Sequence, residues 1–405
     1  MEQITKPELL SPVGDMERLK YAIAYGADAV YLGADKFGMR AAPKNFTDTE
    51  LALAVKYAHE RNVKVYLTLN AVPSNEEIAS LPDFVRIARE CGIDAFIVAD
   101  LGVLAIVKKF APETDIHFST QVGIANYMAA NAAYDLGAKR VVLARELTLN
   151  DIAIIRDNTP DDLELEAFVH GAMCMSFSGR CLLSHYMTGR DANKGECAQP
   201  CRWKFKITDE KNRQYDIGEE DGGSYILNAN DLCTAPFIDQ IIKAGINSLK
   251  IEGRAKSFYY VASVTSAYRK AVDAYLTGKE PFLCPEDVLE ELTRTSHRKY
   301  STGFFFGKDG AVQNTDFGGY IREWDVMGVV EDYNDGIATC TQRGKFFLGQ
   351  ELEALTPAGK LFSFTPAFLW DKDNEEIEST PHAMMEFKIP CDEELPQYTL
   401  LRRKA

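Results

Sequence analysis

The 405-residue sequence lacks long hydrophobic runs, and no apolar stretch approaches the roughly 20 residues that a membrane span needs. Its first residues, Met1–Pro7, lack the basic-then-apolar layout of an export signal. Positive charge is in deficit, because 60 acidic residues oppose 45 basic ones and give a net charge of -15. These absences argue against a membrane protein, a secreted protein and a sequence-blind nucleic-acid binder with a broad basic face. We expect an intracellular, cytoplasmic enzyme of two to three domains, at roughly 150 residues per domain.

Several familiar catalytic or binding signatures are also missing. No Gly-rich phosphate loop follows the first predicted strand, which argues against a dinucleotide-binding, doubly wound sheet. There is no Gly-x-Ser-x-Gly elbow and no His-Glu-x-x-His helix, so hydrolysis by a familiar serine or metalloprotease mechanism has no support. The remaining hydrolytic alternative is a cysteine nucleophile, Cys174 or Cys181, paired with His170 or His185.

From residue 8 to about residue 275, short apolar runs alternate with amphipathic stretches. The apolar runs show no clean alternation, as is typical of parallel strands covered on both faces. Thr47–Glu50 has the pattern of a helix capping box, and Asp15 and Thr148 precede two further amphipathic runs. The predicted strands are Glu8–Ser11, Ala29–Gly33, Lys64–Leu69, Ala95–Ala99, Ile116–Thr120, Arg140–Ala144, Leu163–Val169 and Ser248–Ile251.

A weak internal repeat favours a closed barrel over an open sheet. Gly26, Gly92, Gly137 and Gly245 each stand three residues before a predicted strand, at the start of variants of one phrase, Gly-Ala-Asp-Ala-Val. They precede the second, fourth, sixth and eighth strands, which fits the alternate-strand layering of an eight-stranded α/β barrel. We therefore predict an α/β fold, a TIM-like (α/β)8 barrel over residues 1–280, with an open doubly wound sheet as the alternative.

Three further regions interrupt or follow this barrel. Residues from about 173 to 233 form a Cys-rich insertion after strand seven, and long insertions at the carboxyl ends of barrel strands usually carry function. Residues 281–323 combine a helical pattern with the aromatic-rich Tyr300–Phe306 and are predicted to be a connector. From 324 to 405, short apolar runs are split by turn signals such as Asn334–Gly336, which predicts a small C-terminal all-β barrel.

The cysteines of the insertion are the strongest chemical signal. Cys174, Cys181, Cys197 and Cys201 have six, fifteen and three residues between them, and Cys233 follows. Thiolates are soft ligands, and four of them suit tetrahedral zinc or an iron–sulfur cluster. Structural zinc usually shows two tight pairs, whereas here only Cys197 and Cys201 are close. We therefore predict a 4Fe–4S cluster, with zinc as the alternative cofactor and Cys233 as the alternative fourth ligand.

Polar residues follow nearly every predicted strand, at the barrel face where active sites lie. Arg145 and Arg254 are fixed charges that bind carboxylate or phosphate bidentately. Glu252 is suited to orienting one of them or accepting protons, and His170 joins strand seven to the cysteine cluster. The candidate catalytic residues are therefore His170 and Glu252, and the candidate substrate-binding residues are Arg145, Arg254, Gln121 and Asn70.

A segment of alternating cations and aromatics, Arg202–Lys206, follows the last clustered cysteine. Such a segment is suited to stacking on and clamping an unpaired base, although an edge strand with one buried face would show the same pattern. A similar mixture recurs at Arg254–Tyr260. Because the net charge is negative, RNA binding requires basic residues to gather near Arg202–Lys206, near Arg254–Lys256 and near Arg402–Lys404. The predicted RNA contacts are Arg202, Trp203, Lys204 and Lys256.

Several stretches of the sequence resemble the collagenase-like peptidase family U32, and the resemblance covers essentially the whole chain. The stretches that carry it are Glu8–Pro12, Gly26–Tyr31, Glu166–Cys174, Gly179–Ser184, Gly195–Trp203 and Ser248–Arg254. Despite the family name, many members are implicated in hydroxylation. Within the family the sequence is most similar to the prephenate-dependent tRNA hydroxylases, which act in forming 5-hydroxyuridine at the wobble position.

The resemblance implies a tRNA-modifying enzyme with a four-cysteine iron–sulfur cluster. It makes Cys174, Cys181, Cys197 and Cys201 the expected cluster ligands. Prephenate or a similar small carboxylate is the expected co-substrate, with its carboxylates bound by Arg145 and Arg254. The C-terminal region resembles a translation-factor barrel, which would suit contact with tRNA. The alternatives are a U32 peptidase that hydrolyses peptide bonds, and a non-catalytic, metal-stapled accessory protein for RNA modification.

Overall fold

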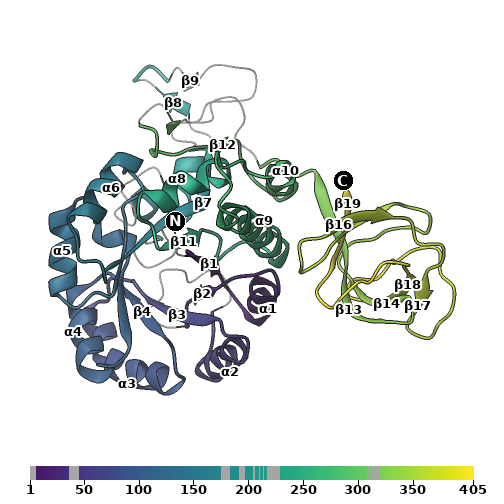
Figure 1. The fold of residues 1–405 in the computed structure, drawn as a ribbon, viewed down its shortest axis with the longest axis horizontal. Helices are drawn as coiled ribbons and strands as arrows, with labels where there is room; N and C mark the ends of the chain where they lie inside the picture. The colour runs from purple at the N-terminus through teal and green to yellow at the C-terminus, as the bar shows by residue number, and fades with distance from the viewer. Residues whose placement is uncertain are drawn as a thin grey trace.

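The computed structural model describes residues 6–35, 45–174, 183–190, 197–203, 206–208, 210–212, 214–216, 229–307, 310–311 and 320–405. Its largest feature is a closed ring of eight parallel strands with helices outside it (Figure 1). The order is β11-β1-β2-β3-β4-β5-β6-β7, and the ring closes because β11 pairs with both β1 and β7. The ring strands are β1 Glu8–Pro12, β2 Ala29–Leu32, β3 Lys64–Leu69, β4 Ala95–Val98, β5 Asp115–Phe118, β6 Arg140–Val142, β7 Glu164–Ala172 and β11 Ser248–Ile251. The predicted TIM-like barrel is confirmed.

The predicted helix starts and stops are also confirmed. Thr47 and Glu50 form a capping box at α2, and the Asp15 and Thr148 side chains accept hydrogen bonds at the starts of α1 and α6. The four repeat glycines all have a left-handed backbone, with φ between +85° and +101°, which explains the repeat as a helix stop that favours glycine. The helices around the ring are α1 Met16–Ala24, α2 Asp48–His59, α3 Asn75–Glu90, α4 Leu101–Phe110, α5 Tyr127–Asp135, α6 Leu149–Asp157, α8 Ile238–Lys243 and α9 Phe258–Leu276. Within the described residues, no helix combines the length and hydropathy needed to cross a bilayer.

Two strands extend the barrel sheet at β7. The first, β10 (Asp231–Cys233), runs antiparallel to β7, and the second, β12 (Tyr300–Ser301), runs parallel to β10. The aromatic-rich segment of the predicted connector therefore joins the barrel sheet. The remaining elements outside the C-terminal region are α7 Leu183–Thr188, α10 Glu286–Arg294, β8 Lys206–Thr208, β9 Gln214–Asp216 and the short 3-10 turns η1 Thr120–Val122, η3 Pro200–Arg202 and η4 Ala235–Phe237.

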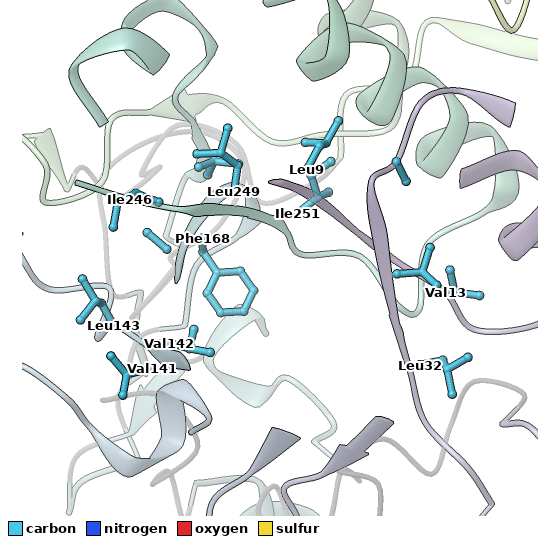
Figure 2. Packing of buried hydrophobic residues seen from close by; sticks show 14 of the residues in the cluster. Leu9, Val13, Leu32, Val141, Val142, Leu143, Phe168, Ile246, Leu249 and Ile251 are labelled. Carbon is cyan, nitrogen blue, oxygen red and sulfur yellow. The ribbon is translucent and has the colours of Figure 1, made fainter. Parts of the chain in front are cut away.

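The main hydrophobic core draws on several strands of the ring and on the helices that pack around them. Figure 2 labels Leu9 of β1, Val142 of β6, Phe168 of β7 and Ile251 of β11 among its buried members, and shows the Phe168 ring pointing into the enclosed space. Burial of these side chains is the main stabilising contribution of the barrel.

The amino-terminal end of the ring is charged. Glu8, the first residue of β1, accepts hydrogen bonds from Arg140 Nη1 at 2.6 Å and Ser248 Oγ at 2.8 Å. Glu166 accepts from Arg140 Nη1 at 3.1 Å and from Lys250 Nζ at 2.6 Å. These groups come from β1, β6, β7 and β11, and the contact between Glu8 and Arg140 joins strands that are not neighbours, so it forms only when the ring is closed.

The C-terminal region is a seven-stranded antiparallel sheet, which confirms its predicted all-β character. Asp335 and Gly336 join β13 to β14 with φ values of 49° and 80°, as the two-residue hairpin turn predicted from the sequence requires. In the order β16-β15-β19-β13-β14-β18-β17, the strands are β16 Leu361–Phe364, β15 Leu352–Leu355, β19 Leu400–Lys404, β13 Trp324–Asn334, β14 Ile337–Gln342, β18 Glu386–Pro390 and β17 Trp370–Asp371.

Arg402 of β19 lies at the contact between this sheet and the barrel. It is fully buried, and its guanidinium binds Glu291 of α10 at 2.7 Å and Glu353 of β15 at 2.9 Å. Its Nη1 also donates to the Tyr259 hydroxyl of α9 at 3.2 Å. The expectation that basic residues near Arg402–Lys404 would serve RNA is therefore wrong for Arg402, because its charge is used inside the protein.

Candidate active site

Arg145 lies three residues beyond β6, at the carboxyl end of the ring. Its Nη1 donates to the Ala172 carbonyl at 2.9 Å, and its Nη2 lies 3.8 Å from Glu252 Oε2. The guanidinium carbon also sits 3.7 Å from the centroid of the Phe168 ring. Its Nε is buried and makes no hydrogen bond within the described part of the chain. Arg145 is thus held in place with one donor available to an anion.

Arg254 crosses the mouth of the barrel from β11 towards β3. Its side chain is only 4% exposed, and it donates to Thr68 Oγ1 at 3.1 Å and to Asn45 Oδ1 at 2.9 Å. Gly33 makes this path possible, since a Cβ atom there would lie 2.1 Å from Arg254 Nη2. A second cation, from a different strand, is therefore fixed at the same face of the barrel.

Asn70 and Gln121 are linked to this face through Ser119, which follows β5. Asn70 Nδ2 donates to Ser119 Oγ at 3.5 Å, and Ser119 Oγ donates to Gln121 Oε1 at 3.4 Å. Asn70 Oδ1 is buried and has no hydrogen-bond partner among the described residues. Because a buried polar atom is normally paired, Asn70 Oδ1 is a candidate acceptor for a bound donor.

Glu146, the neighbour of Arg145, is one of the polar residues that follow the predicted strands, but no role was assigned to it from the sequence. Its Oε2 is buried with no partner in the described structure, and burial raises the pKa of the carboxyl. The signal in the sequence that points to it is its place directly after Arg145, at the end of a barrel strand.

His170 does not face the barrel interior. The register between β7 and β11 shifts after Phe168, so that His170 pairs with Ile251 and shares the outer face with it. Its ring lies among three tyrosines, with ring centroids 5.4 Å from Tyr268, 6.0 Å from Tyr260 and 5.4 Å from Tyr300. The sequence pattern could not reveal this, because a bulge reverses the alternation of strand faces.

Burial of His170 predicts an acid-sensitive contribution to stability. Burial, with smaller contributions from Lys256 and His297, lowers the pKa of His170 to about 3, against about 6.5 for an unfolded histidine. The folded state therefore binds fewer protons, and this stability is complete above pH 6.5 and is lost as the pH falls towards 3. Between pH 7 and pH 5 the loss is about 2 kcal/mol.

We expect the His170→Phe variant to lose about 2 kcal/mol less unfolding free energy between pH 7 and pH 5 than the unsubstituted protein. Urea unfolding at the two pH values measures this difference. His382→Ala is the control, since that side chain is exposed. An unchanged difference in His170→Phe would show that this histidine is not the titrating group. Burial also lowers the pKa of His117, but this histidine is present in all three proteins, so its titration does not contribute to the differences between them.

The cysteines of the predicted cluster lie near the end of β7 and around η3. Cys174 is exposed two residues beyond β7, Cys197 is exposed, and Cys201 is half-buried, whereas Cys181 lies outside the described residues. The Ala198 backbone N–H donates to Ser184 Oγ at 3.0 Å, which ties η3 to α7. The thiol donors have the chemistry that a metal or cluster requires, although no group of three metal-ligating side chains converges in the described part of the chain.

Cys233, the alternative fourth ligand, lies deep in the core. It is buried in β10 opposite His170, and burial raises the pKa of its thiol to about 11. A thiol of raised pKa is a poor metal ligand, because the thiolate is the form that binds. Cys201, which is only half-buried, therefore has the more favourable surroundings for a ligand.

The predicted RNA contacts are only partly described. Trp203 is 41% exposed, whereas the Arg202 side chain and Lys204 lie outside the described residues. Lys256 Nζ donates to the Ser296 carbonyl at 3.2 Å and lies 4.3 Å from the centroid of the Tyr320 ring. Tyr320 was not selected from the sequence.

Comparison with known proteins identifies the family. The model of peptidase family U32 matches residues 14–315, and that of the peptidase family U32 C-terminal domain matches residues 322–402. The chain is 37% identical to tRNA hydroxylation protein P1 of Bacillus subtilis, over 98% of this chain and 95% of that protein. It is 34% identical to the 23S rRNA 5-hydroxycytidine C2501 synthase of Escherichia coli, over 82% of this chain and 50% of that protein. It is 35% identical to a collagenase of Porphyromonas gingivalis, over 74% of each chain. The resemblance inferred from the sequence is confirmed, and the chain belongs to peptidase family U32.

Proposed function

We propose that this protein is an iron–sulfur enzyme of tRNA modification, which hydroxylates the wobble uridine to 5-hydroxyuridine. The observation that carries the proposal is its similarity, over nearly the whole of both chains, to a relative named for tRNA hydroxylation. The relative named as an rRNA hydroxycytidine synthase extends the same chemistry to a second RNA. The expected location is the cytoplasm, where tRNA is modified.

The candidate active site supports a small carboxylate co-substrate, for which prephenate is the expectation. Arg145 is oriented by Glu252 and by the Ala172 carbonyl, which leaves its Nε to donate to a carboxylate. Arg254 supplies the second fixed positive charge from across the mouth. Asn70 Oδ1 is positioned to accept a hydrogen bond from a hydroxyl group, and so to orient the bound molecule.

Cys174, Cys181, Cys197 and Cys201 are the proposed ligands of a 4Fe–4S cluster. When bound, such a cluster supplies one-electron redox chemistry or a Lewis-acidic iron. Cys197 is suited to the role because its sulfur is exposed and accepts a hydrogen bond from the Gln199 N–H at 3.4 Å. Zinc is the alternative cofactor for the same thiolates.

Nucleoside mass spectrometry of tRNA from a deletion strain without paralogues tests the function. We expect 5-hydroxyuridine-derived nucleosides to be absent and to return with the unsubstituted gene. A gene carrying Arg145→Ala should restore less than a tenth of the nucleosides that the unsubstituted gene restores, since removing one side of a buried charged contact costs about 2–5 kcal/mol. Arg86→Ala, on the exposed face of α3, should restore the nucleosides fully. Unchanged nucleosides in the deletion strain would refute the function, and full restoration by Arg145→Ala would favour a non-catalytic accessory role.

A peptidase is the second candidate function, favoured by the similarity to a protein named collagenase. Peptide cleavage by the purified protein that survives removal of the metal would support it. Absence of cleavage by a preparation that restores tRNA hydroxylation would exclude it.

A further inference from the structure

Arg145 and Glu146 occupy one turn at the mouth of the barrel, and each carries a buried polar atom that makes no hydrogen bond within the described part of the chain. On Arg145 this atom is the donor Nε, and on Glu146 it is the carboxyl oxygen Oε2. Buried polar atoms are normally paired, and each exception calls for an explanation. Two such atoms on neighbouring residues of a candidate active site point to a ligand as their shared partner.

The backbone on both sides of this turn is fixed. Before it, the Leu143 N–H donates to the Glu166 carbonyl at 2.9 Å, and the Ala144 N–H donates to the Ile124 carbonyl at 2.9 Å. After it, the capping box at Thr148 starts α6. The two side chains therefore extend from ordered backbone, which lowers the cost of ordering them around a ligand.

Arg145 has a carboxylate beside it already, and that carboxylate is not Glu146. Its Nη1 donates to the Ala172 carbonyl and its Nη2 faces Glu252 at 3.8 Å. Among the described residues, no ion pair joins Arg145 to Glu146. An ionised Glu146 would thus add a second negative charge near a single cation, and would oppose the binding of an anion there.

The surroundings of Glu146 favour its neutral form. Burial raises the pKa of the carboxyl, and backbone hydrogen bonds and the Arg145 charge oppose this effect only in part. An anion bound beside it would raise the pKa further, because a like charge disfavours ionisation. Charged groups on the adjoining elements are Glu252, which faces Arg145, and Asp151 of α6, which accepts hydrogen bonds from Thr148. In its neutral form the Glu146 carboxyl has an O–H group, which is a donor that an anion can accept.

We propose that Glu146 is a ligand-binding residue of the candidate active site, which donates a hydrogen bond as a neutral carboxyl to the carboxylate held by Arg145. Where free Glu146 is ionised, it takes up a proton from the solvent when the anion binds, so that binding and protonation are linked. This inference rests on the proposed function for the class of its ligand, a small carboxylate. It adds to that function a dependence of co-substrate affinity on pH.

Isothermal titration calorimetry tests this role, with prephenate as the probe and anaerobically prepared protein between pH 6.5 and pH 8.5. The affinity should fall as the pH rises, by up to about tenfold per pH unit once free Glu146 is ionised. Titrations at one pH in two buffers of different ionisation enthalpy should show uptake of up to about one proton per molecule bound. The carboxylates of the probe are ionised throughout this range, so the protein supplies the group that titrates.

Two substitutions of Glu146 and one matched control separate its proton from its charge. Glu146→Gln keeps an N–H donor, so at pH 6.5 it should bind within about threefold of the unsubstituted protein, whereas the pH dependence and the proton uptake should disappear. Glu146→Ala should bind about tenfold more weakly at pH 6.5, because it has no donor. Asp157→Asn removes one negative charge from an exposed side chain at the far end of α6, and should keep the full pH dependence.

A pH dependence that persists in Glu146→Gln would overturn this role, and so would the absence of prephenate binding to the unsubstituted protein. If Glu146→Gln fails to fold, Glu146→Ala decides the matter through the same pH dependence. Proton uptake that requires Glu146, together with unchanged nucleosides in the deletion strain, would leave the role of Glu146 standing and refute the proposed hydroxylation. Loss of the nucleosides in that strain, with a pH dependence that persists in Glu146→Gln, would overturn the role of Glu146 alone.

Discussion

Replacing Arg402 with alanine is expected to lower the free energy of unfolding by about 3–5 kcal/mol. Arg402 is fully buried and binds Glu291 and Glu353, both of which are also largely buried. Without the guanidinium, two carboxylates remain in a poorly hydrated contact between the barrel and the C-terminal sheet. Arg294 lies 3.6 Å from Glu291 and 2.8 Å from Glu353. Its single positive charge would then face two buried carboxylates, so it compensates for only part of the loss.

Denaturant unfolding followed by intrinsic fluorescence measures this loss, since Trp324 lies beside Arg402. Lys404→Ala is the control on the same strand, and its exposed side chain should change stability by less than about 0.5 kcal/mol. We also expect Arg402→Ala to separate the transitions of the barrel and the C-terminal sheet. A change of under about 1 kcal/mol, within the range of ordinary surface substitutions, would show that the ion pairs do not hold the two parts together.

If Cys197 is a ligand of the proposed 4Fe–4S cluster, replacing it with alanine should remove nearly all iron and acid-labile sulfide from anaerobically purified protein. A cubane cluster with three of its four thiolates is readily lost, since each ligand holds one iron. Iron and sulfide analysis, together with the visible absorption of the cluster, measures the loss.

Two other cysteines serve as controls for this experiment. Cys91→Ala, at the end of α3, should keep the cluster. Cys233→Ala should keep it too, because that thiol is buried and its raised pKa disfavours the thiolate. Loss of iron from Cys233→Ala with retention in Cys201→Ala would exchange their proposed roles. If the unsubstituted protein contains zinc and no iron, the four cysteines form a zinc site and the proposed cluster is wrong.

Local signals in the sequence were enough to predict the barrel. Lys64–Leu69 and Ser248–Ile251 were predicted with the bounds that the structure has, because each is a short apolar run between clear helix signals. The capping box at Thr47 depends on residues only three apart, and so is visible in the chain. Backbone geometry also explains why glycine recurs before alternate strands.

Features that depend on distant pairing could not be predicted. The outward turn of His170 follows from a register shift against β11, about 80 residues further along the chain. The sheet extension by β10 and β12 likewise joins segments that no local pattern relates. Arg402 was expected to be available to RNA, since nothing near it in the sequence indicates its partners on α10 and β15.

In the candidate site, too, some features follow from local sequence signals and others only from tertiary contacts. Arg145, Arg254 and Glu252 were found because polar residues at the ends of barrel strands share one face. Their mutual geometry, including the space that Gly33 leaves for Arg254, came only from the structure. Tyr320 was missed because it lies beyond the barrel strands and reaches Lys256 by tertiary contact alone.

The paired charges at the amino-terminal end of the ring bear on how the chain folds as it is made. Glu8 and its partner Ser248 are 240 residues apart, and β11 is the last strand to enter the ring. Until the ribosome has released that strand, β1 and β7 are open edges, and open edges invite wrong pairing. Closure of the barrel is therefore a late step of biogenesis, and the edges of β1 and β7 stay exposed to wrong pairing until it occurs.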